Sequence, residues 1–325
     1  MHRHSYRCVI WHIVFVLVAL ATGVAPSRAA DTLKIASPQR GSWEGAIPEL
    51  GRQPGIFQKH GLDLEILYTA GGGETLQVVI AGSVDVGLSG GTLGVMGAFT
   101  KGAPVRIIGA SSTGSREVYW FVPAKSPLQS ISEASNRTLA YSTTGASSHI
   151  AVLRFIQTHN LTGAKPVATG DVASTMTQTV TGQVDVGWAV APFGLDQLAK
   201  GEIRVIGRPH ELPELAGQTI RVQITNARIL AERREVFERY LKAYRETIEW
   251  MYTSPDAVMK YVAFSGFSEP AVRLTVKDFI PKDSLQIDRI MGLVDSMKDA
   301  VAFKFLTQPL TAQQLGELVQ GPAIK

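Results

Sequence analysis

The chain has 325 residues, of which 45% are hydrophobic and 18% charged, with a formal net charge of +4. This length and composition suffice for two globular domains with hydrophobic cores, and they exclude the disordered and fibrous classes of protein.

The first thirty residues have the pattern of a secretory signal peptide. A polar, basic start that contains Arg3 and Arg7 precedes an apolar run at 8–24, and the segment 27–29 supplies the small residues that a signal peptidase recognises. A membrane anchor is the alternative, but the run is interrupted, and no later apolar stretch reaches the ~20 residues that a span requires. We therefore expect residues 1–29 to be cleaved and the mature protein to be periplasmic.

Cleavage would also remove the only cysteine, Cys8, which precedes the apolar run and so cannot carry the lipid of a lipoprotein. The mature protein would then have no disulfide, no thiol chemistry and no thiolate metal site. Its net charge would fall from +4 to +1, because Arg3, Arg7 and Arg28 leave and no acidic residue does. A near-neutral chain without a basic run gives no basis for binding nucleic acid.

An internal repeat organises the mature chain. The segment 75–90, TLQVVIAGSVDVGLSG, recurs one hundred residues later at 175–190 as TMTQTVTGQVDVGWAV, with six of sixteen positions identical. A Lys-Gly pair and an Arg-x-Ile-Gly segment follow each copy in the same order. Chance similarity between strand–helix–strand units is the alternative, but agreement over several blocks favours a duplicated lobe.

Both copies predict alternating strands and helices. In the first we expect strands at 33–37, 62–66 and 84–89, a helical stretch at 47–57 that is broken at 54–55, and a helix at 74–81. In the second we expect a strand at 139–142 and a helix at 147–159, and a helical pattern follows at 236–252. These elements predict an α/β protein of two lobes, each a mostly parallel sheet flanked by helices, with a ligand cleft between them.

The chain is expected to cross between the lobes near 114–118 and near 222–229. This prediction assigns 30–115 and 226–325 to lobe I and 116–225 to lobe II.

Glycine and hydroxyl residues follow the predicted strands, where ligands of open parallel sheets bind. Glycines expose backbone N–H groups, helix N-termini favour anions, indoles offer flat walls, and an arginine can pair with a carboxylate or sulfonate. Singly, each feature also suits an ordinary turn, cap or core residue. Together they predict a site for a small organic anion, with these candidate ligand-binding residues: Arg40, Trp43, Gly72, Ser89, Gly90, Thr92, Thr144, Ser147, Ser148 and Trp188.

One enzyme motif is present. Residues 87–91, GLSGG, match the G-x-S-x-G pattern that exposes a serine nucleophile, so a secreted hydrolase that uses Ser89 is an alternative. The pattern is short, and the repeat explains the segment as a strand end without chemistry. The four histidines beyond the signal segment are scattered without metal-ligand spacing. We therefore expect no catalytic residue, no metal and no cofactor.

Several motifs resemble one family of proteins. They are GIF at 55–57, HGLDLE at 60–65, AGSVDVG at 81–87, GASSH at 145–149 and VDVGW at 184–188 with Pro192. Together they resemble the periplasmic solute-binding proteins of the nitrate/sulfonate/taurine class of ABC importers, which are related to the pyrimidine-precursor proteins of thiamine synthesis. The resemblance covers about residues 33–255.

This resemblance implies a type II periplasmic binding protein fold that docks, with its ligand, on a membrane permease powered by a cytoplasmic ATPase. By motif position it implies pocket roles for Trp43, Ser89, Gly90, Ser147, Ser148 and Trp188. A chain without mature cysteine departs from the family's cysteine-bearing yeast enzymes, which favours transport over synthesis. A monomeric receptor is expected, a ligand-presenting sensor module is the alternative, and sulfonate, taurine, nitrate and carboxylate remain open as ligands.

Overall fold

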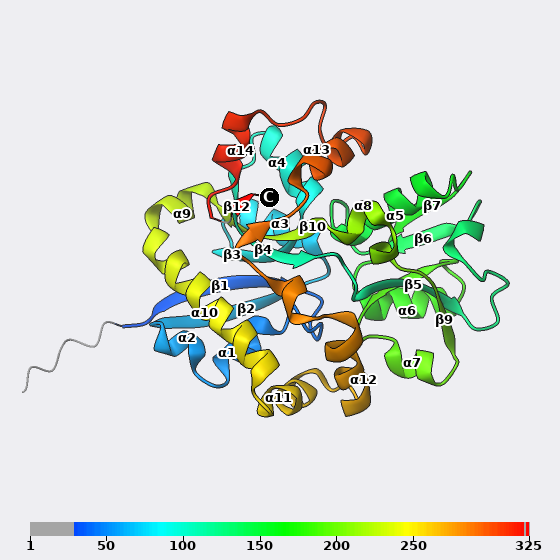
Figure 1. Ribbon diagram of the computed structural model, residues 1–325, viewed down its shortest axis with the longest axis horizontal. Coiled ribbons are helices and arrows are strands. Elements are labelled where there is room, and N and C mark those ends of the chain that lie inside the picture. The colour runs from blue at the N-terminus through cyan, green and yellow to red at the C-terminus, as the bar shows by residue number, and fades with distance from the viewer. Residues whose placement is uncertain (1–28, 322, 325) are drawn as a thin grey trace, which may run out of the picture.

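The computed structural model describes residues 29–321 and 323–324, so the predicted signal peptide lies, apart from Ala29, outside the described residues. Figure 1 shows two α/β lobes side by side, lobe I built from the two ends of the described chain and lobe II from its middle, in green. Within the described part of the chain, no helix combines the length and the apolar character needed to cross a membrane.

Lobe I is built on a five-stranded sheet in the order β2-β1-β3-β10-β4. Strands β1 and β2, and β1 and β3, pair in parallel, whereas β10 is antiparallel to its neighbours β3 and β4. The strands are β1 (Asp31–Pro38), β2 (Leu62–Thr69), β3 (Val86–Gly91), β4 (Val105–Thr113) and β10 (Thr219–Asn226). The predicted mostly parallel sheet with flanking helices is confirmed.

Helices cover both faces of this sheet (Figure 1). The predicted break in the first helical stretch is present, because Gly55 has a φ of 78° and separates α1 from α2. The helices of lobe I are α1 (Ile47–Arg52), α2 (Ile56–Lys59), α3 (Gly72–Ile80), α4 (Thr92–Thr100), α9 (Ala227–Glu232), α10 (Arg234–Thr253), α11 (Asp256–Ser265), α12 (Glu269–Leu274), α13 (Leu293–Ala302) and α14 (Ala312–Leu318). Short elements complete it: η3 (Thr275–Phe279), η4 (Lys282–Leu285), β11 (Arg289–Ile290) and β12 (Ala323–Ile324).

Lobe II repeats this arrangement with shorter strands. A three-stranded sheet has the order β8-β5-β9, β6 and β7 form a parallel pair, and a bridge between Leu139 and Val186 joins the two parts. Its strands are β5 (Val118–Pro123), β6 (Thr138–Tyr141), β7 (Lys165–Ala168), β8 (Gly187–Val190) and β9 (Ile203–Gly207). Its helical segments are η1 (Ile131–Glu133), α5 (Ser147–Thr158), α6 (Val172–Val180), α7 (Leu195–Ala199), η2 (Pro209–Glu211) and α8 (Pro213–Ala216).

The position of β10 differs from the predicted lobe boundary at 225/226. This strand lies inside the sheet of lobe I, between β3 and β4, so the return crossing precedes Thr219. The first crossing runs from the end of β4 at Thr113 to the start of β5 at Val118. The repeat could not mark the return, because the strand of lobe II that corresponds to β10 is β5, which comes first in its lobe.

The aspartate of each V-D-V-G repeat has a structural role. The Asp85 carboxylate accepts a hydrogen bond from the backbone N–H of Lys34, within β1, with an N–O distance of 2.8 Å. The Asp185 carboxylate accepts the equivalent bond from Thr138 at 2.8 Å, and the Thr138 hydroxyl donates another at 2.7 Å. The repeat therefore ties the start of β3 to β1 in lobe I and the start of β8 to β6 in lobe II.

Asp185→Asn is expected to lower the free energy of unfolding by about 1 kcal/mol near pH 7. The substitution removes a charge-assisted hydrogen bond, whose contribution is reduced because the carboxylate is partly exposed to solvent. Burial alone would raise the pKa of Asp185, but hydrogen bonds from Thr138 and the charge of Arg137 lower it below its ordinary value. The ionised carboxylate therefore stabilises the fold above that value, and this contribution is lost as the pH falls through the lowered pKa. Urea unfolding should show the deficit at neutral pH and its loss in acid. Exposed Asp63→Asn is the control, and a deficit independent of pH would contradict the argument.

Candidate ligand-binding site between the lobes

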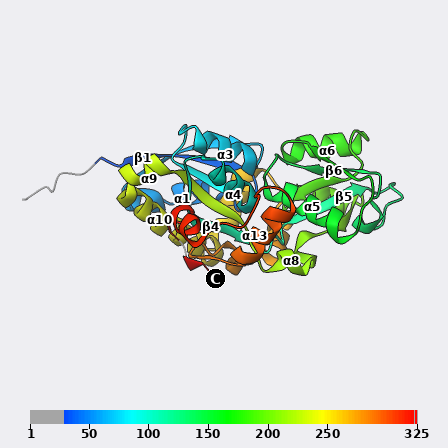
Figure 2. The ribbon, with the colours of Figure 1, turned by 90° about the horizontal axis from the view of Figure 1, so that it is seen from above.

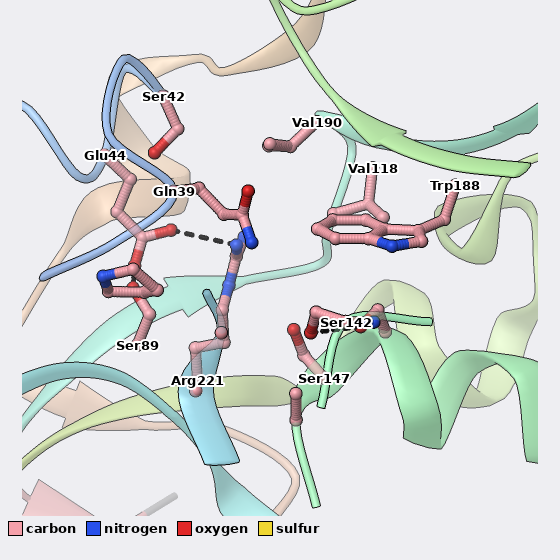
Figure 3. Close-up of a pocket in the computed structure, with 15 residues that line it drawn as sticks. Gln39, Ser42, Glu44, Ser89, Val118, Ser142, Ser147, Trp188, Val190 and Arg221 are labelled. Atoms are coloured by element: carbon pink, nitrogen blue, oxygen red, sulfur yellow. Dashed lines mark hydrogen bonds and ion pairs between the residues drawn. The ribbon is translucent and has the colours of Figure 1, made fainter. Parts of the chain in front are cut away.

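A cavity lies between the lobes, at the carboxyl ends of β1, β3 and β8 (Figure 3). About 440 Å³ of space free of protein atoms lies within it, part of which is open to solvent. Both lobes line it, through Pro38, Gln39, Ser42, Glu44, Gly71, Gly72, Ser89, Val118, Ser142, Ala146, Ser147, Ser148, Trp188, Val190 and Arg221.

Two helix N-termini meet at this cavity, those of α3 in lobe I and α5 in lobe II. Neither N-cap residue caps its helix with its own side chain, and in α3 the Gly73 N–H donates to Thr143 Oγ1 of lobe II at 2.9 Å, which leaves the other first-turn N–H groups for other acceptors. Hydroxyls surround the start of α5, where the Ser142 N–H donates to Ser148 Oγ at 3.0 Å and the two hydroxyls lie 2.8 Å apart. Because N–H dipoles and hydroxyls converge here, this end of the cavity suits an anionic group.

Trp188 forms a wall of the cavity together with Val118 and Val190. Its indole Nε1 is buried and has no hydrogen-bond partner among the described residues. Figure 3 shows this nitrogen on the side of the ring that faces Ser142 and Ser147. The indole can therefore contribute both an apolar face and one more donor to a ligand.

The other end of the cavity carries charge. Glu44 is 3% exposed and its Oε2 lies 3.2 Å from Arg221 Nη1, placed as an ion pair rather than a hydrogen bond. Arg221 is 8% exposed and also pairs with Glu117, which is 1% exposed and lies in the first crossing segment. The Ser89 hydroxyl donates to Glu44 Oε1 at 2.6 Å, and Arg221 Nη2 donates to Ser112 Oγ at 3.1 Å.

Two lining residues have left-handed backbone conformations that non-glycine residues rarely adopt. Gln39 has a φ of 57° and Ser89 a φ of 53°, each at an energetic cost on the order of 1 kcal/mol. The Gln39 side chain donates to the Ala70 carbonyl in lobe I and accepts from the Val172 N–H of lobe II at 3.1 Å. Its strained backbone therefore supports a side chain that bridges the two lobes.

The lobes are closed around the cavity. In Figure 2, α13 of lobe I lies beside α5 of lobe II, where Asp299 pairs with Arg154. The other polar contacts across the seam include Gly73 N to Thr143 Oγ1 (2.9 Å) and Ser268 Oγ to Asp196 Oδ1 (2.7 Å). The two lobes therefore contact each other at the start of α3 and through the C-terminal segments of lobe I, which include α13.

The structure brings five of the ten predicted site residues to the cavity: Gly72, Ser89, Ser147, Ser148 and Trp188.

Trp43 lies elsewhere, contrary to its expected place in the pocket wall. The side chain is fully buried in the core of lobe I, its Nε1 donates to the Tyr252 hydroxyl at 3.1 Å, and its ring meets those of Tyr252 and Tyr261 edge-on. The indole is therefore directed toward α10 and α11, and the neighbouring Glu44 lines the cavity instead.

The remaining four predicted residues also lie outside the cavity lining. Arg40 lies in an outer groove, 5.8 and 5.2 Å from the ring centroids of Tyr68 and Phe264. Gly90 faces Ile224 in the core, since a Cβ there would lie 3.2 Å from its Cδ1. Thr92 donates to the Thr219 carbonyl at 2.7 Å, and Thr144 is exposed.

Five polar or charged residues that line the cavity were not among the predicted site residues: Gln39, Ser42, Glu44, Ser142 and Arg221.

Among residues 29–321 and 323–324, no group of three or more His, Cys, Asp or Glu side chains is placed to hold a metal ion.

Comparisons with known proteins give the family and the fold. Residues 50–258 match the NMT1/THI5 like family, and no curated protein matches the chain. The alkanesulfonate-binding protein SsuA from Xanthomonas axonopodis pv. citri, solved with MOPS, is 16% identical, with a TM-score of 0.74 over 90% of this chain and 100% of that one. The periplasmic nitrate-binding protein NrtA from Synechocystis PCC 6803 is 12% identical, with a TM-score of 0.67 over 90% of this chain and 86% of that one.

An enzyme shares the fold as well. The desulfurization enzyme DSZB is 14% identical, with a TM-score of 0.58 over 87% of this chain and 95% of that one. At these identities the structures establish the periplasmic binding protein fold, and the match over 50–258 establishes the family. The chain belongs to the NMT1/THI5-like family.

Proposed function

We propose that this protein is the periplasmic solute-binding receptor of an ABC importer. It closes on a small organic anion and delivers it to a membrane permease that a cytoplasmic ATPase powers. The observation that carries this proposal is a cavity lined by both lobes, at which the N-termini of α3 and α5 meet. The sulfonate-binding and nitrate-binding proteins of the same fold support an anionic ligand.

The mechanism is closure. A ligand that touches α3 in lobe I and α5 in lobe II gains contacts only when the lobes meet, so it stabilises the closed arrangement. The permease recognises that arrangement, and no bond in the ligand is broken.

A thermal-shift screen tests the proposal. The protein from Ala30 onward would be mixed with small sulfonates, carboxylates, nitrate, bicarbonate and pyrimidines. A ligand at 100 times its Kd raises the free energy of unfolding by about 2.7 kcal/mol. A clear rise in melting temperature with one class of compound supports a receptor, and no change in melting temperature with any class counts against it.

The hydrolase alternative has less support. Ser89 lies at a strand end as the motif requires, but its hydroxyl donates to Glu44, which faces Arg221. The cavity lining contains no histidine to act as the base. Ester turnover that Ser89→Ala abolishes would favour the hydrolase over the receptor.

Trp188→Ala is expected to weaken ligand affinity by about 10- to 100-fold and Ser148→Ala by about fivefold, because they remove a buried aromatic wall and one hydroxyl of the anion end. Calorimetric titration gives both values, and circular dichroism checks the fold. Thr144→Ala is the matched control, since Thr144 belongs to the same loop but is exposed. Unchanged affinity in both variants would contradict the placement of the ligand.

A further inference from the structure

The charges around Arg221 do not balance. Its guanidinium faces two carboxylates, Glu44 and Glu117, and all three side chains are at least nine-tenths buried. Tyr244 lies nearby but adds no charge, because burial raises the pKa of its hydroxyl well above the ordinary value. With both carboxylates ionised, the cluster has one negative charge more than its single guanidinium compensates, which is unfavourable in a buried place.

Arg221 is consequently a poor partner for an anion. Two carboxylates already face it, so it presents no excess positive charge to a ligand. The anionic group of a ligand is better placed at the opposite end, with the serines of α5 and the indole N–H of Trp188.

Glu44 retains capacity to accept hydrogen bonds. Its Oε1 takes one bond from Ser89 and its Oε2 takes none, while each carboxylate oxygen has two lone pairs. Figure 3 shows Glu44 and Ser89 across the cavity from Trp188 and Ser147, with the guanidinium of Arg221 between the two sides. The cavity thus has an acceptor end and a donor end.

We propose that the ligand carries a positively charged hydrogen-bond donor, such as an ammonium group, besides its anionic group, and that Glu44 binds this donor. This inference rests on the proposed function and narrows its ligand class to small zwitterions. With Glu44 and Glu117 both ionised, an ammonium group would bring the net charge of the cluster and the ligand donor together to zero, so both ends of the ligand would contribute to closure.

Matched pairs of ligands test this inference by calorimetric titration. The pairs are 2-aminoethanesulfonate with ethanesulfonate, and 3-aminopropionate with propionate. In the wild-type protein, the amino member of the pair that binds should bind about tenfold or more tightly than its partner. Glu44→Gln should abolish that preference, because the amide keeps the Ser89 contact but loses the charge.

Glu65→Gln, at a side chain that is 63% exposed on β2, is the control and should keep the preference. Glu44→Asp, which keeps the charge on a shorter side chain, should give an intermediate ratio and replaces Glu44→Gln if that variant does not fold.

Three outcomes overturn the inference and leave the receptor standing: equal or tighter binding of the amine-free members, a preference that survives Glu44→Gln, or a best ligand from the screen without a cationic donor. Failure of both pairs and of the whole thermal-shift screen overturns the receptor itself.

Discussion

Gly94→Ala is expected to weaken ligand binding on the order of a hundredfold while leaving the ligand-free protein at least as stable as wild type. A Cβ at Gly94 would lie 2.5 Å from the carbonyl oxygen of Gly145, which belongs to the other lobe. No rotamer change relieves contact with a backbone carbonyl, so the lobes must move apart. In the open protein the clash is absent, and alanine favours the helix by about 0.5–1 kcal/mol over glycine.

The experiment pairs affinity with stability. Calorimetric titration measures the loss of binding, and urea unfolding without ligand measures stability. Gly316→Ala in α14 is the matched control, because a Cβ there meets nothing within 4 Å. Retained affinity in Gly94→Ala would show that the ligand does not require this closed approach, and a loss of stability without ligand would place the clash within the resting fold.

The glycine-rich strand ends were predicted as ligand contacts, and the structure shows a second use for them. A Cβ at Gly91 would lie 2.1 Å from the Gly145 oxygen, and one at Gly73 would lie 2.3 Å from the Thr144 oxygen. These glycines let the two lobes meet. A sequence pattern cannot distinguish the two uses, because both need a backbone that a neighbour can approach closely.

The α/β fold could be predicted because the internal repeat shows the same strand–helix–strand pattern in both halves of the duplicated segment. Ser89 and Trp188 directly follow the two V-D-V-G segments, and Gly72, Ser147 and Ser148 lie where helices were predicted to start, and all five line the cavity. Trp43 failed for a reason that local sequence does not contain. Its indole packs against Tyr252 and Tyr261, about two hundred residues later in the chain, whereas Trp188 follows the direction of its own strand into the cavity.

The charged end of the cavity was missed because its three residues are brought together by topology. Glu44 follows β1, Glu117 lies at the first crossing, and Arg221 lies on β10, whose place between β3 and β4 the repeat did not mark. The sequence did contain one indication of a buried charge. Arg221 is the only charged residue of its strand, TIRVQITN. A buried strand rarely carries such a residue without a partner.

Arg221→Met is expected to destabilise the ligand-free protein by about 3–5 kcal/mol, because it leaves two buried carboxylates without their cation. Urea unfolding measures the loss. Arg228→Met is the control, since its pair with Glu232 is exposed on one helix and should contribute less than about 1 kcal/mol.

Adding Glu117→Gln to Arg221→Met should recover part of the stability, because one of the two stranded charges is then removed. Equal losses in the single and double variants would show that Glu117 is not coupled to Arg221. Recovery of stability in the double variant would also bear on the connections between the lobes. Glu117 lies in the segment that crosses into lobe II and Arg221 in the strand that follows the return, so the pair joins both connections between the lobes at the edge of the cavity. A ligand that changes the charge beside Glu44 therefore acts on the same cluster that holds the two crossings together, which links occupancy of the cavity to the relative position of the lobes.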